Sequence, residues 1–259
     1  MFGDFLHFKI FIIRGQKVFL NNLLTDESID DMIQIEIDSS VKRRIEMAIE
    51  TFEKLPKDKQ QAILAAGIRI FATKSYAEAK TETITKECGI SKGLLFHYFG
   101  SKREFYLYCL GKALEQLLSQ TQKPSGDGFY DVLFSFMDAK IRLCTEYVDE
   151  MHFVNMASRE SASEVEEGKQ KLIGMYSLKV REESIGCMAT ALRTLPLKEN
   201  ASQQTAEAFT LYTNAVMNKY LLRYQKEPDE FFKNTTMVKE EMKQYLDMML
   251  YGICKGEGK

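Results

Sequence analysis

Hydrophobic side chains recur three or four residues apart through most of the chain beyond residue 56, and this spacing predicts amphipathic helices. The first clear example follows Pro56, whose fixed φ suits the first turn of a helix, and runs from Lys57 to Phe71. Ser75 and Tyr76 then interrupt the pattern. Long alternating segments of the kind that form strands are absent after the first forty residues. The pattern therefore predicts an all-α protein.

Two short helices separated by a tight turn are expected next. The first covers residues 81–88 with Thr81 as its N-cap, and Gly89 supplies the turn. Ser91 caps the second, which extends through Phe99. The apolar positions predict the core of a small domain, formed by Ile63, Phe71, Ile84, Ile90, Leu95 and Phe99.

Longer helices fill the rest of the chain. Gly100 ends the preceding short helix, and Ser101 caps the next one. The residues 123–128, KPSGDG, form the clearest break, and Pro196 stops a long amphipathic stretch. The expected helical ranges are about 102–120, 129–150, a shorter segment through 159, then 163–195, 201–224 and 236–253.

Charge is distributed unevenly along the chain. The net charge of −2 is not typical of a nucleic-acid-binding protein. Between Pro56 and Glu104, however, nine Lys or Arg residues face five acids, which gives this segment +4 and leaves −6 for the remainder. The positive charge is concentrated where a phosphate backbone could use it.

Composition argues against several other classes of protein. Five scattered cysteines without a CxxC pair or a Cys/His cluster support neither a disulfide framework nor a metal site, and a reducing cytoplasm is the expected compartment. No apolar run approaches the length of about 20 residues that spans a bilayer. GxSxG, P-loop and dinucleotide motifs are missing. We expect no enzyme activity, no cofactor and no membrane association.

The two short helices and their turn have the layout of a helix-turn-helix, which places its second helix in the major groove of DNA. The segment AILAAGIRIFATKSYAEAKTETITKECGISKGLLFHYFGSKREFYLY resembles the N-terminal domain of the tetracycline-repressor (TetR) family. The ITKECGISKG turn, the LFHYF recognition helix and the SKREF opening of the next helix all fall in family order. FEKLPKDK, just before this segment, is similar to a subgroup common in Gram-positive bacteria.

Three residues depart from the family pattern. Ser75 stands where many members have Gly, Thr85 where a small Ala is usual, and Phe96 where many have Tyr. The last change removes a hydroxyl that could bind a phosphate, so one expected DNA contact is put in question.

The resemblance implies roles for residues of this domain. Residues facing outward from the recognition helix should meet base edges, because Lys can donate to guanine and Leu can touch a thymine methyl; these are Lys92, Gly93, Leu94 and His97. Phosphate contacts are expected from Thr81, Thr83, Ser91, Tyr98 and Lys102. The plainer alternatives are that His97 and Tyr98 only pack, and that Lys92 and Lys102 are solvated surface lysines.

The resemblance also implies that the body dimerises and binds a small molecule. The last two helices of the family usually form a four-helix bundle with their twins, and matching apolar stripes are Ala208, Leu211, Ala215, Leu222, Tyr245, Met248 and Met249. Adaptable side chains that could line a ligand pocket are Phe136, Phe153, Met156, Met175, Tyr176, Met188 and Tyr212. The same residues could equally be ordinary core.

These observations predict three segments: an N-terminal extension at 1–46, a DNA-binding domain at 47–104, and a helical ligand-binding and dimerisation domain at 105–259. The expected function is a repressor that binds a palindromic operator as a dimer and is released by a small-molecule inducer. Alternatives are a regulator or activator of the same fold that needs no ligand, and an interaction scaffold that no longer binds DNA.

Residues 1–46 allow three interpretations. Charged residues break up their apolar stretch, which is not the order found in a signal peptide. The segment could be a hairpin or helix packed on the body, a functional arm, or a stretch not made in the cell. We favour the last, because Met47 begins a natural-looking start and Arg43–Arg44, if encoded AGG-AGG, would place a ribosome-binding sequence just upstream. The nucleotide sequence of the gene tests this.

Overall fold

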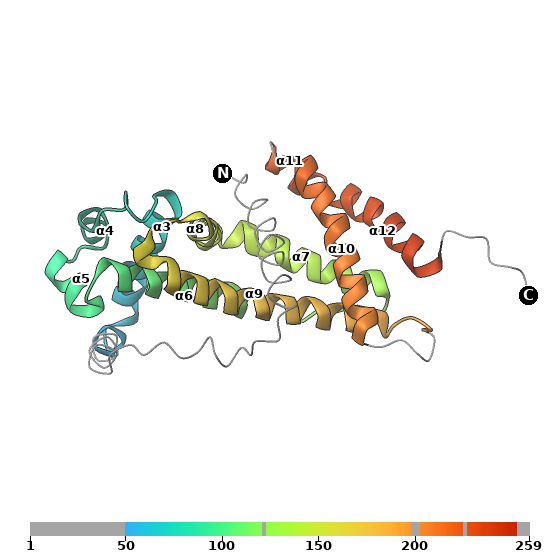
Figure 1. The fold of residues 1–259 in the computed structure, drawn as a ribbon, viewed down its shortest axis with the longest axis horizontal. Coiled ribbons are helices and arrows are strands. Elements are labelled where there is room, and N and C mark those ends of the chain that lie inside the picture. Colours follow the sequence, from blue (N-terminus) through green and yellow to red (C-terminus); the bar gives the residue numbers. More distant parts are fainter. Residues whose placement is uncertain (1–49, 121–122, 198–202, 225–226, 253–259) are drawn as a thin grey trace, which may run out of the picture. The chain divides into compact units, whose positions relative to one another are not determined.

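A computed structural model describes residues 50–120, 123–197, 203–224 and 227–252. Every regular element in these ranges is a helix (Figure 1), which confirms the all-α fold class. None of these helices combines the length and the apolar character that crossing a bilayer requires. The expectation for residues 1–46 concerns a segment that lies outside the described ranges.

The helices form two compact units. Of the described residues, those in 50–117 and 148–175 form one unit, and the remaining ones between 118 and 252 form the other. These units do not coincide with the division at residue 104 expected from the sequence, since residues 148–175 join the unit of the helix-turn-helix.

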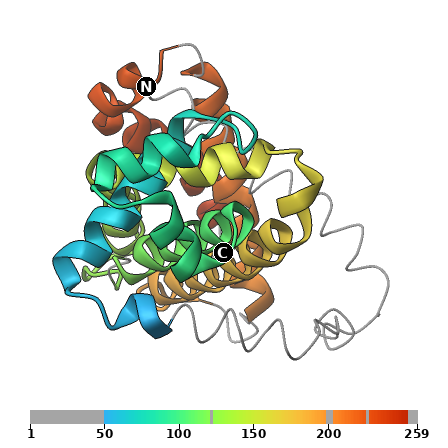
Figure 2. The same cartoon turned by 90° about the vertical axis from the view of Figure 1, so that its left-hand side faces the viewer.

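The unit that contains the helix-turn-helix is built from the two short helices of that motif and four other helical segments. Its elements are α3 (Lys57–Thr73), α4 (Thr81–Cys88), α5 (Lys92–Phe99), α6 (Lys102–Ser119), α8 (Val148–Arg159) and the first part of α9 (Ser163–Leu192). Figure 2 views this unit from the side of α4 and α5. The expected short helices and turn are confirmed.

The caps explain where α5 and α6 begin. Ser91 Oγ accepts a hydrogen bond from the Leu94 N–H at 3.1 Å, and Ser101 Oγ accepts one from Glu104 at the same distance. Gly89 has φ 69° at the turn, a left-handed conformation that costs glycine little. The cap expected for α4 is wrong: Lys80 occupies the N-cap position there and makes no side-chain cap.

Close packing of aromatic residues forms the core of this unit. Five of the six expected core residues are almost fully buried, whereas Ile90 is only partly buried. The Phe71 ring stacks on Phe153 of α8 at 5.4 Å and meets Tyr106 of α6 edge-on at 4.8 Å. Helix α8 is therefore packed directly against α3 of the helix-turn-helix.

The second unit joins the remaining helices around two apolar clusters. Its elements are α7 (Phe129–Glu146), the rest of α9, α10 (Gln203–Arg223), α11 (Pro228–Lys233) and α12 (Thr235–Tyr251). One cluster joins α7, α9, α10 and α12, and the other joins α7, α10, α11 and α12. Helix α7 ends four residues earlier than expected, and α11 was not expected from the sequence.

Candidate nucleic-acid interface

Helix α5 presents one face to the interior and the opposite face to solvent. Leu95, Tyr98 and Phe99 are buried, and the four residues expected to contact bases are exposed: Lys92, Gly93, Leu94 and His97. A Cβ built on Gly93 would make only an ordinary van der Waals contact, with Ser91 Oγ 3.9 Å away. The exposed face of α5 is therefore free to approach a groove.

The five residues expected to contact phosphates lie in different surroundings. Thr83 and Ser91 are exposed on α4 and at the start of α5. Thr81 and Tyr98 are each only 6% exposed, which leaves their side chains little surface to offer a phosphate. Lys102 is partly buried, with its Nζ 4.5 Å from the centre of the Tyr76 ring.

Lys92 makes an ion pair across the helix-turn-helix. Its Nζ lies 2.6 Å from Oε1 of Glu82, which belongs to the first turn of α4. The hydrogen bond from Lys92 is the largest of the effects that lower the pKa of the Glu82 carboxyl to about 2. Glu82 is therefore ionised wherever the protein is folded near neutral pH.

The two departures from the family pattern that lie outside α5 are accommodated by local hydrogen bonds. The Ser75 hydroxyl donates to Glu78 Oε2 at 2.8 Å, so the serine is tied into its turn. Thr85 is buried, and its hydroxyl donates to the Glu82 carbonyl at 3.2 Å. Neither substitution leaves an unpaired polar group in the helix-turn-helix.

Polar contacts tie the helix-turn-helix to both ends of α8. Near the start of α8, the Arg69 guanidinium lies 3.0 Å from Glu87 of α4 and 3.8 Å from Asp149. After its end, Glu160 Oε2 accepts the backbone N–H of Tyr76 at 2.5 Å. The α3–α4 loop and both ends of α8 are therefore linked through side chains.

Residues near the start of α6 reach the first turn of α9. The Arg103 Nε donates to the Glu164 carbonyl at 2.7 Å. Partial burial is the largest influence on the Lys102 ammonium and lowers its pKa, while the charges of Glu164 and Glu160 act in the opposite direction. Lys102, an expected phosphate contact, thus lies beside the acids that follow α8.

Large apolar side chains lie exposed on α10 and α12 in the second unit. Leu211 is 59% exposed, Leu222 54% and Met248 50%. Ala208 and Ala215 are also exposed, whereas Tyr245 and Met249 are partly buried. The opposite sides of both helices pack into the two apolar clusters, so each helix is apolar on an inner and an outer face.

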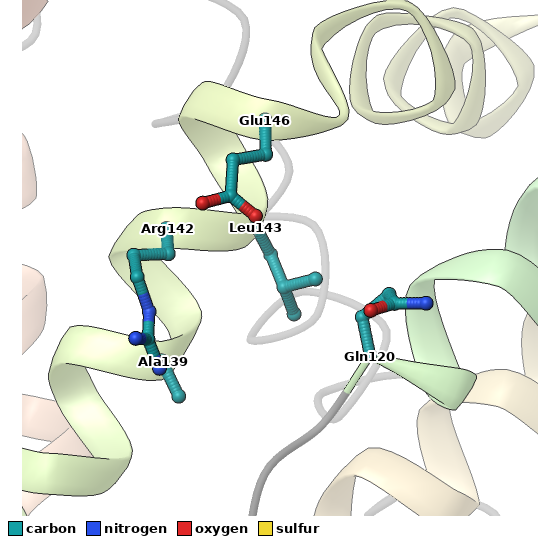
Figure 3. Close-up of a pocket in the computed structure, with 5 residues that line it drawn as sticks. All are labelled: Gln120, Ala139, Arg142, Leu143 and Glu146. Carbon is teal, nitrogen blue, oxygen red and sulfur yellow. The ribbon is translucent and has the colours of Figure 1, made fainter.

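The expected ligand-pocket residues are divided between the two units. Phe153 lies in the core of the helix-turn-helix unit, Met175 is exposed and Met156 is partly buried. In the second unit Tyr176 is buried, and Phe136 and Tyr212 pack against the cluster that contains Met188. A surface pocket in the second unit has other lining residues (Figure 3): Gln120, Ala139, Arg142, Leu143 and Glu146.

Sequence patterns missed three side chains that shape this region: Glu82, Arg69 and Glu160. The partners of Glu82 and Arg69 lie ten or more residues away, and Glu160 binds a backbone N–H 84 residues earlier in the chain. Helical periodicity relates residues that are three or four positions apart, so it does not predict pairs at such separations. The only available signal was a mixture of acids and bases in a segment of net positive charge.

Comparison with known proteins supports the interpretation of this region. Residues 63–109 match the model for bacterial regulatory proteins of the tetR family. An HTH-type transcriptional regulator of Bacillus subtilis strain 168, YerO, is 31% identical over 80 residues, which cover 29% of this chain and 28% of that protein. The HTH-type transcriptional activator FasR of Mycolicibacterium smegmatis is 23% identical over 158 residues, 49% of this chain and 72% of that protein.

A solved structure extends the similarity in fold. The putative transcriptional regulator from Pseudomonas aeruginosa PAO1 is similar over 78% of this chain and 95% of its own length, with a TM-score of 0.52 and 17% identity. At that identity the likeness concerns the fold alone. Residues 63–109 therefore form a helix-turn-helix region similar to that of the tetR family of bacterial regulatory proteins, and the chain spans less than a third of the length of YerO.

Proposed function

We propose that the protein is a repressor that binds a palindromic operator as a homodimer and is released by a small-molecule inducer. The observation that carries the proposal is the exposed outer face of α5, on which Lys92, Leu94 and His97 stand clear of the packed core. A helix of this kind can enter the major groove, which is wide enough to admit it.

DNA binding is tested by fluorescence anisotropy on a duplex from the region upstream of the gene, with random-sequence DNA as competitor. Lys92→Ala should weaken sequence-specific binding about 5- to 150-fold, because a good base contact contributes about 1–3 kcal/mol of discrimination. Lys86→Ala removes an equal charge from the exposed surface of α4 and is the matched control. Equal losses in both variants would contradict a role for Lys92 in reading bases.

The exposed apolar face of α10 and α12 supports the proposed dimer. Full burial of one Leu stabilises an interface by about 1.5–3 kcal/mol, and Leu211 and Leu222 are each more than half exposed. A two-fold axis would use each residue twice. Pairing of these helices with their copies in a partner is therefore favourable, and it would place two recognition helices on one palindrome.

The dimer is tested by sedimentation of Leu211→Glu and Leu222→Glu. We expect both to be monomeric at concentrations where the wild type is a dimer, and to bind the operator more weakly. Met175→Glu places the same charge on a residue that is also about half exposed but lies in the other unit. A monomeric Met175→Glu, or a dimeric Leu211→Glu, would contradict the proposed interface.

For the inducer we propose the apolar cluster that contains Met188, against which Phe136 and Tyr212 pack. Aromatic and Met side chains can reshape around an apolar ligand. The chain contains no Trp, so Phe136→Trp supplies a single fluorescent reporter for titration with a panel of small amphipathic molecules. A molecule that changes this emission should lower operator affinity, and operator DNA should lower its affinity by the same factor.

Activation is the second candidate, and the name of FasR as a transcriptional activator favours it. Transcription in vitro from a promoter carrying the bound site separates the two roles. The repressor proposal requires fewer transcripts when protein is added and recovery when a ligand releases it. An increase in transcripts on protein addition would establish activation instead.

A further inference from the structure

The base-contact candidate Lys92 has an anionic partner within its own domain. The 2.6 Å contact with Glu82 joins the first turn of α4 to the first turn of α5. Both side chains are exposed, so the pair lies at the end of the helix-turn-helix that carries the proposed DNA contacts. A carboxylate at this position would face a surface of phosphates.

Glu82 differs in this respect from the other acids between residues 75 and 104. The other three have partners outside the proposed base contacts: Glu78 with Ser75, Glu87 with Arg69, and Glu104 with Arg103. Glu82 is therefore paired with a residue that is proposed to read DNA, whereas the other three acids are paired with residues outside the proposed base contacts.

We infer that Glu82 is a specificity-determining residue, whose carboxylate withholds the Lys92 ammonium from DNA phosphates and presents it to a base edge. This inference rests on the proposed DNA-binding function. Glu82 would then have two effects, one on binding to DNA of random sequence and one on binding to the operator.

On DNA without the operator sequence, the complex is held by phosphate contacts and by the counterions that they release. An ammonium that is already neutralised by Glu82 releases fewer of them, and the carboxylate itself repels phosphate. Both effects weaken binding to random sequence.

On the operator, the ion pair between Lys92 and Glu82 favours binding. The Lys92 ammonium has three N–H donors; Glu82 takes one, which leaves two for the O6 and N7 acceptors of a guanine. The long side chain is also held in place before DNA arrives, so less rotamer freedom is lost on binding. The ratio of specific to non-specific affinity rises.

The test compares Glu82→Gln with Glu87→Gln, which makes the same charge change on the same helix but acts on Arg69. The probes are a duplex that the wild-type protein selects from a randomised library and short duplexes of random sequence. For Glu82→Gln we expect random-sequence binding to tighten about two- to fivefold, with a salt dependence steeper by about 0.9. Binding to the selected duplex should stay equal or weaken.

Glu87→Gln should change both affinities by one common factor, and Glu82→Gln made in a Lys92→Met background should lose its effect on the ratio. The inference is overturned if Glu82→Gln leaves the ratio unchanged or alters it equally with and without Lys92. Failure of the wild type to select any sequence, or to form a salt-sensitive complex, is a separate result that overturns the proposed DNA-binding function itself.

Discussion

Gly67 of α3 lies against Phe105 and Cys109 of α6, and its replacement by Ala should destabilise the protein. A Cβ added at Gly67 would lie 2.6 Å from Cζ of Phe105 and 2.7 Å from Sγ of Cys109. Both neighbours are fully buried, so neither can move into solvent to make room.

The expected magnitude is the difference between two effects. Extra volume in a packed core costs about 1–3 kcal/mol, whereas Gly to Ala inside a helix stabilises it by about 1 kcal/mol. We expect Gly67→Ala to lower the free energy of unfolding by about 1 kcal/mol. Gly174 is exposed on α9 with nothing within 4 Å of an added Cβ, so Gly174→Ala should raise the same quantity by about 0.5–1 kcal/mol.

Urea unfolding followed by far-ultraviolet circular dichroism measures both variants at the same fixed protein concentration. Phe105→Leu removes the two ring atoms nearest the added Cβ and should relieve part of the cost when combined with Gly67→Ala. A Gly67→Ala variant as stable as Gly174→Ala would refute the argument that the contact between α3 and α6 leaves no room for a Cβ at Gly67.

Three further predictions concern other parts of the helix-turn-helix unit. Glu160→Ala removes the acceptor of the Tyr76 N–H and should cost about 1–3 kcal/mol; hydrogen exchange in residues 74–80 should accelerate, and unchanged exchange would count against the link. Asn155 is buried with neither side-chain amide atom hydrogen-bonded, so Asn155→Leu should leave the urea midpoint unchanged or raise it, and a large decrease would indicate a partner for the amide. Burial and the nearby charge of Glu53 raise the pKa of Tyr108 from 10.0 to about 12. A raised folded-state pKa means that this stabilisation is complete below pH 10.0 and is lost as pH rises towards 12. Tyr108→Phe should therefore lose less stability than the wild type over that window, and an equal loss would contradict the shift.

Local signals in the sequence predicted most helix boundaries near α5 because glycine and serine determine them chemically. Gly89 and Gly100 both have positive φ, and Ser91 and Ser101 both accept a backbone N–H. Thr81 was expected to do the same for α4, but the helix begins at Thr81 itself, one residue earlier than that cap would require. A threonine inside the first turn and a threonine at the cap are hard to distinguish from sequence.

Other boundaries left no local signal. Helix α7 ends where Tyr147 adopts φ −116° and ψ 54°. The sequence has neither Gly nor Pro at this position, so it gives no sign that the helix ends there. Helix α11 has six residues, too few for a hydrophobic period to appear, although Pro228 at its first turn marks the start. Short elements of this kind are fixed by tertiary packing.

Placement of the functional side chains was only partly predictable. The exposed face of α5 follows from helical periodicity, since Leu95 and Phe99 point inward together. The position of the Phe153 side chain does not follow from periodicity, because its apolar spacing within α8 is the same whether it lines a ligand cavity or packs on Phe71. In the structure Phe153 packs on Phe71 in the core of the helix-turn-helix unit. No pattern within α8 predicts this position.

The attachment of α8 limits how a signal can reach DNA. Arg69 links α3 to the start of α8, Glu160 links the residues after α8 to the α3–α4 loop, and the aromatic contact of Phe153 lies between them. A helix held at both ends and in its middle cannot slide along α3 without breaking buried contacts. A movement of α8 should therefore carry α3 and the recognition helix with it as one body. In the proposed dimer, the separation between the two recognition helices would then change by rotation of whole units, and the contacts within each unit would stay intact.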